Sequence, residues 1–305
     1  MRELLFTVLL AAHLLCVNVA AGAPILALAC EWGDARGSSL ARRAGRYLSW
    51  SALLSLIAGL VIGLALFAIR WSPQYSAAVA RLHYKLGWGG GELAFSFVLM
   101  LIAVVLWQGT GSSAAWLRWL RGFLSFLNGA NLLYHFPFLF LVLSRLAQTD
   151  AISEEPITAV KFRSLMIAGD TPALAVHVVF ASIAMAGIAL LGYALRLQRE
   201  ATDLQEAKSL AQWGALGALV PTLAQIPTGL WILASMPGIE QSRLLDLSPA
   251  GFCFLLSLGL ALWLMQTLAA IAAGETARRM LISAMGISTT VVVLMTVAWR
   301  LSRAF

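Results

Sequence analysis

Eight long apolar runs follow one another along this sequence of 305 residues and limit what the chain can fold into. A helix needs about 20 residues to cross the hydrocarbon core of a bilayer. Because no water is available there, every backbone N–H and C=O must bond within its own segment, so runs of this kind form helices. The runs are 3–29, 47–70, 90–109, 114–144, 171–197, 209–236, 250–273 and 279–302. We expect an all-α fold, a polytopic membrane helix bundle of about eight transmembrane helices, with 1–305 forming one transmembrane domain.

The composition agrees with this class. Hydrophobic residues make up 60% of the chain and charged residues 11%, whereas soluble domains carry about 25% charged residues. The net charge of +7 raises the question of nucleic acid, but basic pairs such as Arg42-Arg43 and Arg278-Arg279 lie between apolar runs. Membrane proteins place such residues against anionic headgroups. We therefore expect membrane lipid, and no nucleic acid, as a partner.

Two further features of the sequence bear on its class. The three cysteines form neither CxxC nor CxxCH, which excludes a thiol redox pair, a zinc knuckle and covalently attached c-type haem. The first apolar run resembles a secretory signal peptide up to Ala23. It continues to Ala29, however, which makes it long enough to span, and it contains His13. We expect this helix to be retained.

The loops and the prolines give two expectations about arrangement. Eight spans put both termini on one side, with ten Lys/Arg on that side and eleven, more densely spaced and with fewer acids, on the other. The positive-inside rule then favours, by this small margin, termini outside the cell. Four prolines inside the spans are expected to kink a helix or end it locally: Pro24, Pro137, Pro221 and Pro227.

Ionisable residues at membrane depth are costly and often functional. His13 lies near the middle of the first run, and His177 lies in the fifth, on a face with Ala173, Ala181 and Ala184. A small-residue groove beside a histidine suits a porphyrin with imidazole as its axial ligand. The same groove suits plain helix packing, and each histidine also suits a hydrogen-bonded core position. The residues alone leave both interpretations open.

The fourth run carries a polar stripe, because its polar residues recur at intervals of three and four. The stripe is Arg121, Ser125, Asn128, Asn131 and His135. It could line a proton or water channel, form a wall for haem propionates, or be an interhelical hydrogen-bond seam. We favour the seam for Asn128 and Asn131 and keep His135 as a third candidate ligand.

Glu92 follows three glycines at the predicted start of the third span. It is either an interfacial helix cap, favoured by the unsatisfied N–H groups there, or an acid for proton entry beside a cofactor. His83 is expected to be solvated in a loop. No GxxxxGK[ST] motif is present, so a nucleotide-driven motor is excluded.

The order of these features resembles subunit I of the cytochrome bd quinol oxidases, over about residues 10 to 235. The matching pieces are His13-Leu14-Leu15 with Glu31, His83-Tyr84 with Gly89 to Phe95, Gly129-Ala130-Asn131-Leu132, and Phe162 to Ile167 followed by His177. The resemblance implies that His13 ligates a high-spin haem, that His177 is an axial ligand of a low-spin haem b, and that Glu92 lies near the high-spin haems. It also implies a multi-pass protein of the bacterial cytoplasmic (inner) membrane, and the charge bias of the loops then puts the termini on the periplasmic side.

The sequence also departs from that family. Met100 stands where a second glutamate is expected, Leu255 where a methionine ligand is expected, and Cys253 where an arginine is expected. The long quinol-binding loop is reduced to 237–249. Quinol oxidation in the family's manner is therefore in doubt. A sixth ligand opposite His177 would come from His135, Met265 or another subunit, unless the iron stays five-coordinate.

These observations lead to one functional expectation and two alternatives. We expect a haem-binding subunit of a bacterial respiratory electron-transfer complex; an oxidoreductase complex like a terminal oxidase is one such complex. Its donor would be another membrane subunit or a c-type cytochrome. The first alternative is a cofactor-free scaffold or assembly subunit that keeps the fold. The second is a transporter, which predicts inverted repeats and broken helices; no repeat is evident in the sequence.

Overall fold

The computed structural model describes residues 2–108, 114–148, 155–200 and 204–303. Over these residues the fold is all-α, with eleven helices and no strand. Eight of the helices are long and apolar enough to cross a membrane. They are α1 (Arg2–Ala35), α2 (Ser39–Arg70), α4 (His83–Trp107), α5 (Ala115–Ala147), α7 (Thr171–Glu200), α8 (Leu204–Ser235), α10 (Pro249–Ala272) and α11 (Arg278–Ser302). Each contains most of one predicted run, which confirms the predicted fold class.

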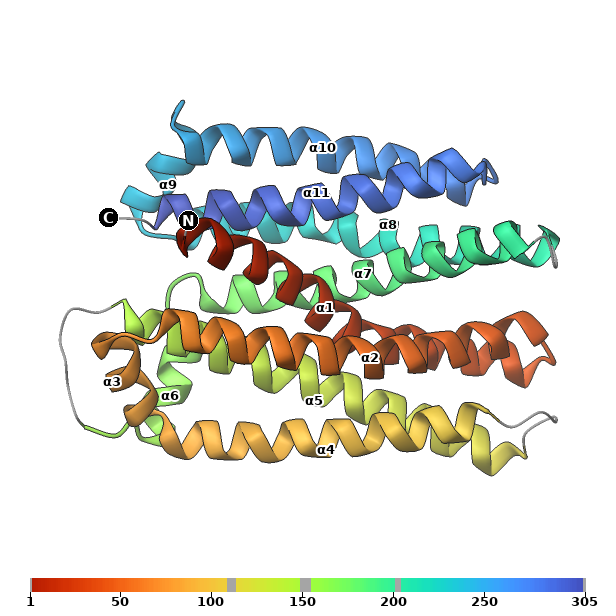
Figure 1. Ribbon diagram of the computed structural model, residues 1–305, viewed down its shortest axis with the longest axis horizontal. Coiled ribbons are helices and arrows are strands. Elements are labelled where there is room, and N and C mark those ends of the chain that lie inside the picture. The colour runs from red at the N-terminus through yellow and green to blue at the C-terminus, as the bar shows by residue number, and fades with distance from the viewer. Residues whose placement is uncertain (1, 109–113, 149–154, 201–203, 304–305) are drawn as a thin grey trace.

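Three short helices lie at the end of the molecule where both chain termini lie, which we call the terminal end (Figure 1). They are α3 (Pro73–Arg81), α6 (Ala159–Met166) and α9 (Gly238–Leu245). The side chains of Ser72 and Thr158 cap α3 and α6 by accepting from backbone N–H groups, as N-cap residues commonly do. The other end, which we call the opposite end, carries the connections α1–α2, α4–α5, α7–α8 and α10–α11.

The eight long helices form two groups of four, side by side in Figure 1. The first bundle consists of α1, α2, α4 and α5, and the second of α7, α8, α10 and α11, with each helix packed on neighbours in its own group. The two bundles meet mainly where α1 packs on α7. At the terminal end, Arg303 pairs with Asp170 at 2.6 Å and with Glu240 at 2.8 Å, which ties the end of α11 to the start of α7 and to α9.

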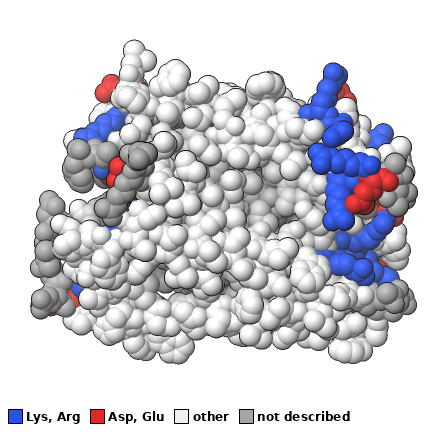
Figure 2. Space-filling view, viewed as in Figure 1, with Lys and Arg blue, Asp and Glu red and all other residues white. Residues whose placement is uncertain are grey.

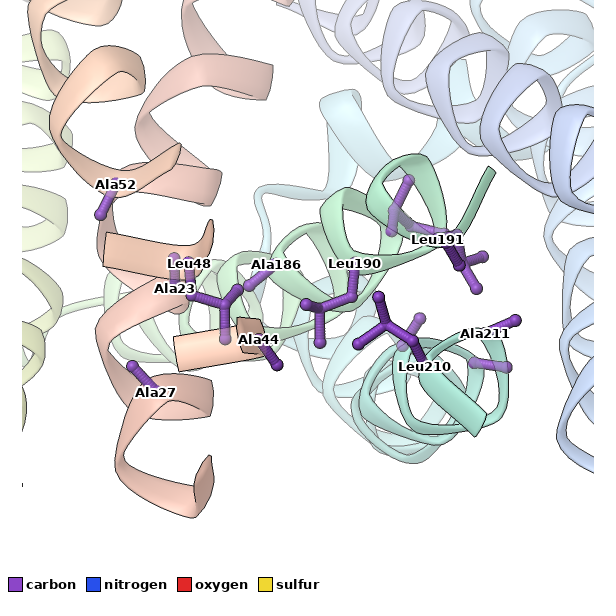
Figure 3. Packing of buried hydrophobic residues seen from close by; sticks show 14 of the residues in the cluster. Ala23, Ala27, Ala44, Leu48, Ala52, Ala186, Leu190, Leu191, Leu210 and Ala211 are labelled. Atoms are coloured by element: carbon purple, nitrogen blue, oxygen red, sulfur yellow. The ribbon is translucent and has the colours of Figure 1, made fainter. Parts of the chain in front are cut away.

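Small side chains allow the helices to approach closely where the bundles meet. Figure 3 shows alanines of α1, α2 and α7 facing one another, among them Ala23, Ala44 and Ala186, which are all fully buried. A Cβ on Gly22 of α1 would lie 1.9 Å from the carbonyl oxygen of Ser182 on α7. In lipid, where apolar surface gives no drive for association, such close backbone contact adds van der Waals packing that favours helix association.

The four prolines inside spans do not end any helix. Pro24 lies within α1, Pro137 within α5, and Pro221 and Pro227 within α8. Each helix continues through its proline, because neighbouring helices and local side chains can satisfy the freed carbonyls. Of the two expected effects, a kink or a local helix end, the local end is therefore excluded at these four positions.

Candidate functional site

His13 lies at membrane depth and packs against two glycines of α2. It is eleven residues after the start of α1 at Arg2, about 16 Å along the helix axis. Its Nδ1 lies 2.9 Å from the carbonyl oxygen of Gly59, and a Cβ on Gly63 would lie 3.0 Å from its Cε1. A carbonyl only accepts, so Nδ1 carries the proton and donates it. The neutral ring then has a free lone pair on Nε2, the atom that a metal ion can bind.

His177 lies on α7 and faces α8. It is half-buried, and its Nδ1 is 3.5 Å from the Thr228 hydroxyl, a distance at the outer limit of a hydrogen bond. That hydroxyl also lies 3.1 Å from the Gln225 carbonyl and 3.2 Å from the Ala224 carbonyl of its own helix. The His177 ring is thus held more loosely than that of His13.

The small-residue face beside His177 is largely covered by neighbouring helices. Ala173 is fully buried and Ala184 is 8% exposed, while Ala181 is half-buried. These alanines serve the close packing of α7.

The two histidines lie at the same depth but face different helices. In Figure 1, α1 and α7 run in the same direction, and they meet where the Ser182 hydroxyl donates to Asn18 Oδ1 at 3.0 Å. His13 and His177 each precede this contact by five residues, about 7.5 Å along their axes. Because His13 packs on α2 and His177 on α8, the structure places them in two separate environments and does not bring them together.

The stripe on α5 is buried along most of its length. Arg121, Ser125, Asn128 and Asn131 are all less than 9% exposed. The Asn131 amide donates to the Ser96 hydroxyl at 2.9 Å and to the Glu92 carbonyl at 3.0 Å, so it links α5 to α4. The Oδ1 atom of Asn128 is buried without a hydrogen-bond partner among the described residues.

His135 differs from the rest of the stripe because it is exposed. Its ring lies edge-on to that of Tyr134, with the centroids 5.0 Å apart. His83 is exposed too, but it begins α4 instead of lying in a loop. Its Nδ1 lies 2.9 Å from the Ala80 carbonyl.

Glu92 lies within α4 and not at its start. The helix begins at His83, nine residues earlier, so Glu92 lies about 13 Å further along the axis. The interpretation as an interfacial helix cap is therefore wrong, since all N–H groups near Glu92 are inside the helix. Its side chain is half-buried and has no hydrogen bond or ion pair among the described residues.

The most extensive polar cluster lies at the opposite end of the first bundle, and the sequence did not predict it. Arg121 Nε and Nη2 donate to the two carboxylate oxygens of Glu31 at 2.8 and 2.9 Å. Arg121 Nη2 also donates to Asp34 at 2.6 Å. Arg42 holds the other oxygen of Asp34 from 2.8 Å. Arg121, Glu31 and Asp34 are 2%, 6% and 4% exposed, so these charges are buried and must be paired.

Trp107 covers this charge cluster. Its side chain is fully buried. The Arg121 guanidinium carbon lies 4.1 Å from the centroid of its ring, which makes a cation–π contact. A Cβ on Gly45 would lie 2.2 Å from the same ring, so only glycine leaves room for the indole against α2. The cluster thereby joins α1, α2, α4 and α5 at one end.

The fold resembles that of one solved structure, a bd oxidase. A chain in "The structure of bd oxidase from Geobacillus thermodenitrificans" matches with a TM-score of 0.77, over 99% of this chain and 86% of that chain. This chain has a bd-oxidase-like fold. The sequence identity is 13%, so the likeness concerns the fold. No model of a protein family matches the sequence, and no curated protein matches it.

Within the bd-oxidase-like fold, single histidines are the positions at which a metal group can be held. The described residues contain no group of three or more His, Cys, Asp or Glu side chains placed to hold a bare metal ion. A haem iron needs only one or two protein ligands. His13 fits this requirement best, because one ring nitrogen is fixed by the Gly59 carbonyl and the other has no partner among the described residues.

One sequence signal could have revealed the charge cluster. Glu31 and Asp34 lie one turn apart near the end of the first predicted run, and Arg121 lies at membrane depth in the fourth. An arginine within a span needs a buried partner, and these two carboxylates lie within or next to a predicted span at the same end. The predicted stripe included Arg121 but paired it with no acid.

Proposed function

We propose that this protein is a haem-binding membrane subunit of a bacterial respiratory electron-transfer complex. The observation that supports this most directly is the His13 ring, which is fixed at membrane depth with a free Nε2 lone pair. The bd-oxidase-like fold supports the same class of protein. The subunit would lie in the bacterial cytoplasmic membrane, with its termini on the periplasmic side.

In this proposal His13 on α1 and His177 on α7 are the residues that hold b-type haem. Haem, when bound, supplies a one-electron carrier whose potential depends on its axial ligand and on burial. The Gly59 carbonyl selects the His13 tautomer and makes the ligating nitrogen more basic, as second-shell acceptors do for metal-bound histidines. Thr228 is placed to do the same for His177, over the longer distance of 3.5 Å.

Glu92 is the proposed proton-carrying residue. Its carboxylate is half-buried within α4 and has no partner among the described residues, so it can take up or release a proton without breaking an ion pair. Asn131 fixes the α4 backbone at this position by donating to the Glu92 carbonyl. His135 is exposed on α5. It therefore remains a candidate ligand only for a haem that lies between this chain and another subunit.

The proposed electron donor is another membrane subunit or a c-type cytochrome. Between α8 and α10 the chain forms only the short helix α9 and its flanking residues. This segment is small for a quinol-binding domain, which is why a protein donor is proposed. A partner at the terminal end would meet α3, α6 and α9, which all lie there.

The experiment is a reduced-minus-oxidised absorption spectrum of the purified full chain, together with its iron content. We expect haem bands in the wild type and an altered band pattern, with less iron per chain, in His13→Ala and His177→Ala. The matched control is His83→Ala, which removes an exposed imidazole at the terminal end and should leave the spectrum unchanged. An iron-free wild-type protein would overturn the proposal, and so would unchanged spectra in both test variants.

The packing around His177 favours one alternative, a cofactor-free scaffold or assembly subunit. The alanine face that would admit a porphyrin is instead buried, with Ala173 at 0% and Ala184 at 8% exposed. This alternative predicts a folded, colourless and iron-free protein. A transporter has less support, because α8 continues through Pro221 and Pro227 and transporters of that kind use discontinuous helices.

A further inference from the structure

Two glycines one turn apart on α2, Gly59 and Gly63, lie against α1. A small residue at every fourth position is a pattern by which membrane helices approach closely. Gly59 fits this use, because a Cβ there would lie 3.0 Å from Val17 Cγ1, 3.5 Å from Cys16 Cβ and 3.6 Å from the Val17 nitrogen. All three atoms belong to the part of α1 that packs on α2, so Gly59 serves the approach of the two helices.

Gly63 faces an imidazole ring instead. The three atoms nearest to a Cβ at this position all belong to His13: Cε1 at 3.0 Å, Nδ1 at 3.3 Å and Nε2 at 4.0 Å. Non-bonded carbon atoms attract one another best at about 3.5–4.0 Å, so a methyl group on residue 63 would press on the ring edge between the two nitrogens. Glycine at this position leaves the space that the ring edge occupies.

The His13 ring is also bonded to this turn of α2. Its Nδ1 donates to the Gly59 carbonyl oxygen at 2.9 Å. In an α-helix a carbonyl points toward the residue four positions later, whose N–H it accepts, so the Gly59 oxygen lies at the level of Gly63. The ring reaches this oxygen through the space that Gly63 leaves open. The two glycines therefore act on one ring, because Gly59 supplies the acceptor and Gly63 supplies the room.

The depth of this contact makes the hydrogen bond important. Figure 2 shows charged side chains gathered at the two ends of the visible face, with an uncharged band between them. His13 lies about 16 Å along α1 from its start, at the depth of that band. Little water competes for Nδ1 there, and a polar group that loses its bond in such surroundings is costly. The bond to Gly59 therefore determines the orientation of this half-buried ring.

We propose that Gly63 is a positioning residue for His13, which together with the Gly59 carbonyl fixes the rotation of the ring and the direction of its Nε2 lone pair. The inference rests on the proposed function for the haem that Nε2 would hold, whereas the orientation of the ring is a property of this chain alone. In Gly63→Ala the new methyl group moves the ring away from α2. The bond from Nδ1 to the Gly59 carbonyl then lengthens, and the proton is no longer confined to Nδ1.

The test compares Gly63→Ala with the wild type in the purified full chain, and it has one readout for a haem-containing protein and one for an iron-free protein. With haem present, we expect the midpoint potential of the haem that His13→Ala alters to become more positive, because the ligand loses the acceptor that makes it more basic. In an iron-free protein, nuclear magnetic resonance of isotope-labelled histidine nitrogens shows which ring nitrogen carries the proton. We expect Nδ1 alone in the wild type and both tautomers in Gly63→Ala.

A second measurement shows whether the His13 ring is what the new methyl group meets. In a denaturant titration in micelles, Gly63→Ala should unfold at a lower midpoint than the wild type. The same substitution should cause no loss in the His13→Ala background, because the ring is gone. The matched control is Gly259→Ala on α10, where a Cβ would meet no atom within 4 Å. It should change neither the potential nor the tautomer.

The remaining outcomes separate this inference from the proposed function. An unchanged potential in the haem-containing protein, or an unchanged tautomer in the iron-free one, would overturn the inference. An equal loss of stability with and without the His13 ring would overturn it too. An iron-free wild type would overturn the proposed function alone, since the tautomer still decides whether Gly63 positions the ring. If Gly63→Ala does not fold but its combination with His13→Ala does, the ring is the obstacle, as inferred; if neither folds, it is not.

Discussion

Each of the two bundles contains a different kind of buried polar residue. In the first bundle the buried polar residues include carboxylates, an arginine and amides, such as Glu31, Arg121 and Asn131. In the helices of the second bundle, the buried polar residues described are all serine or threonine. Those hydroxyls mostly donate to carbonyls of their own helix, as Thr222 does to Ala218 at 2.7 Å. They therefore add little specificity between helices.

The two bundles therefore use different contacts between helices: directional polar contacts in the first, and close packing of complementary surfaces in the second. The first bundle joins its helices by ion pairs and amide hydrogen bonds, which fix rotation and register. The second relies on backbone approach through small residues, as where a Cβ on Gly187 would lie 2.5 Å from the Ala218 nitrogen. In lipid both solutions work, because neither depends on excluding water. The proposed proton carrier, Glu92, lies in the first bundle, which also contains the buried ion pairs and amide hydrogen bonds.

The largest expected effect comes from Arg121→Met, which removes the bidentate partner of Glu31 and one of the two arginines that pair with Asp34. Removing one member of a buried ion network typically costs about 3–5 kcal/mol. We expect a loss of that order in the free energy of unfolding, measured by denaturant titration in micelles. The double variant Glu31→Leu/Arg121→Met should be less destabilised, because one unpaired carboxylate is gone. A loss below about 1 kcal/mol for the single variant would show that the cluster is solvated.

The next effect is in the second bundle, where Gly187→Ala forces α7 away from α8. The new methyl group would lie 2.5 Å from the Ala218 nitrogen and 2.7 Å from the Gly214 carbonyl oxygen. Overpacking of this kind typically costs about 1–3 kcal/mol. The same unfolding measurement checks it. The control is Gly259→Ala on α10, whose new Cβ would meet no atom within 4 Å and should not destabilise the protein. Equal effects of the two variants would refute shape-based packing.

A smaller effect is expected for the amide seam of the first bundle. Asn131→Leu removes the bonds to Ser96 and to the Glu92 carbonyl, which in membranes are worth about 0.6–1.7 kcal/mol. Asn128→Leu is the matched comparison, because its Oδ1 has no partner among the described residues. It should cost less than Asn131→Leu, or nothing, in the same denaturant titration. If Asn128→Leu lowered the free energy of unfolding more than Asn131→Leu does, the interhelical hydrogen-bond seam would lie at Asn128 instead.

The architecture was predictable from the sequence because lipid imposes one solution on a long apolar run. Backbone groups must bond within the segment, so each run is a helix whatever its neighbours are. The same rule explains where α4 was mispredicted. The glycines before Glu92 favour a loop in water, since glycine costs about 1 kcal/mol in a helix, yet α4 begins at His83. In a membrane the need to satisfy the backbone outweighs that cost.

The charge cluster was not predictable in the same way, because its members come from distant parts of the chain. Arg121 is 90 residues from Glu31 and 87 from Asp34, and nothing local fixes their pairing. The positions of His13 and His177 on separate helices were predicted, but the helix against which each histidine packs was not. The helix partner of each histidine depends on how the two bundles pack, and this follows from many small contacts such as that of Gly22 with Ser182.

The smallest effect on the free energy of unfolding is expected for Arg196→Gln. This variant tests whether an arginine–carboxylate pair must be buried, as in the first bundle, to stabilise the protein. Arg196 donates to Glu200 at 2.7 Å one turn later on α7, but the two side chains are 70% and 47% exposed. Exposed pairs are screened by solvent and lose side-chain entropy on forming, so many contribute nothing measurable. We expect no detectable change in the denaturant titration that reports a large loss for Arg121→Met. Both arginines form short bonds to a carboxylate at the same end of the molecule, so distance cannot separate them. A comparable loss for Arg196→Gln would mean that pairing at this end stabilises regardless of burial, and the contrast between the bundles would then need another cause.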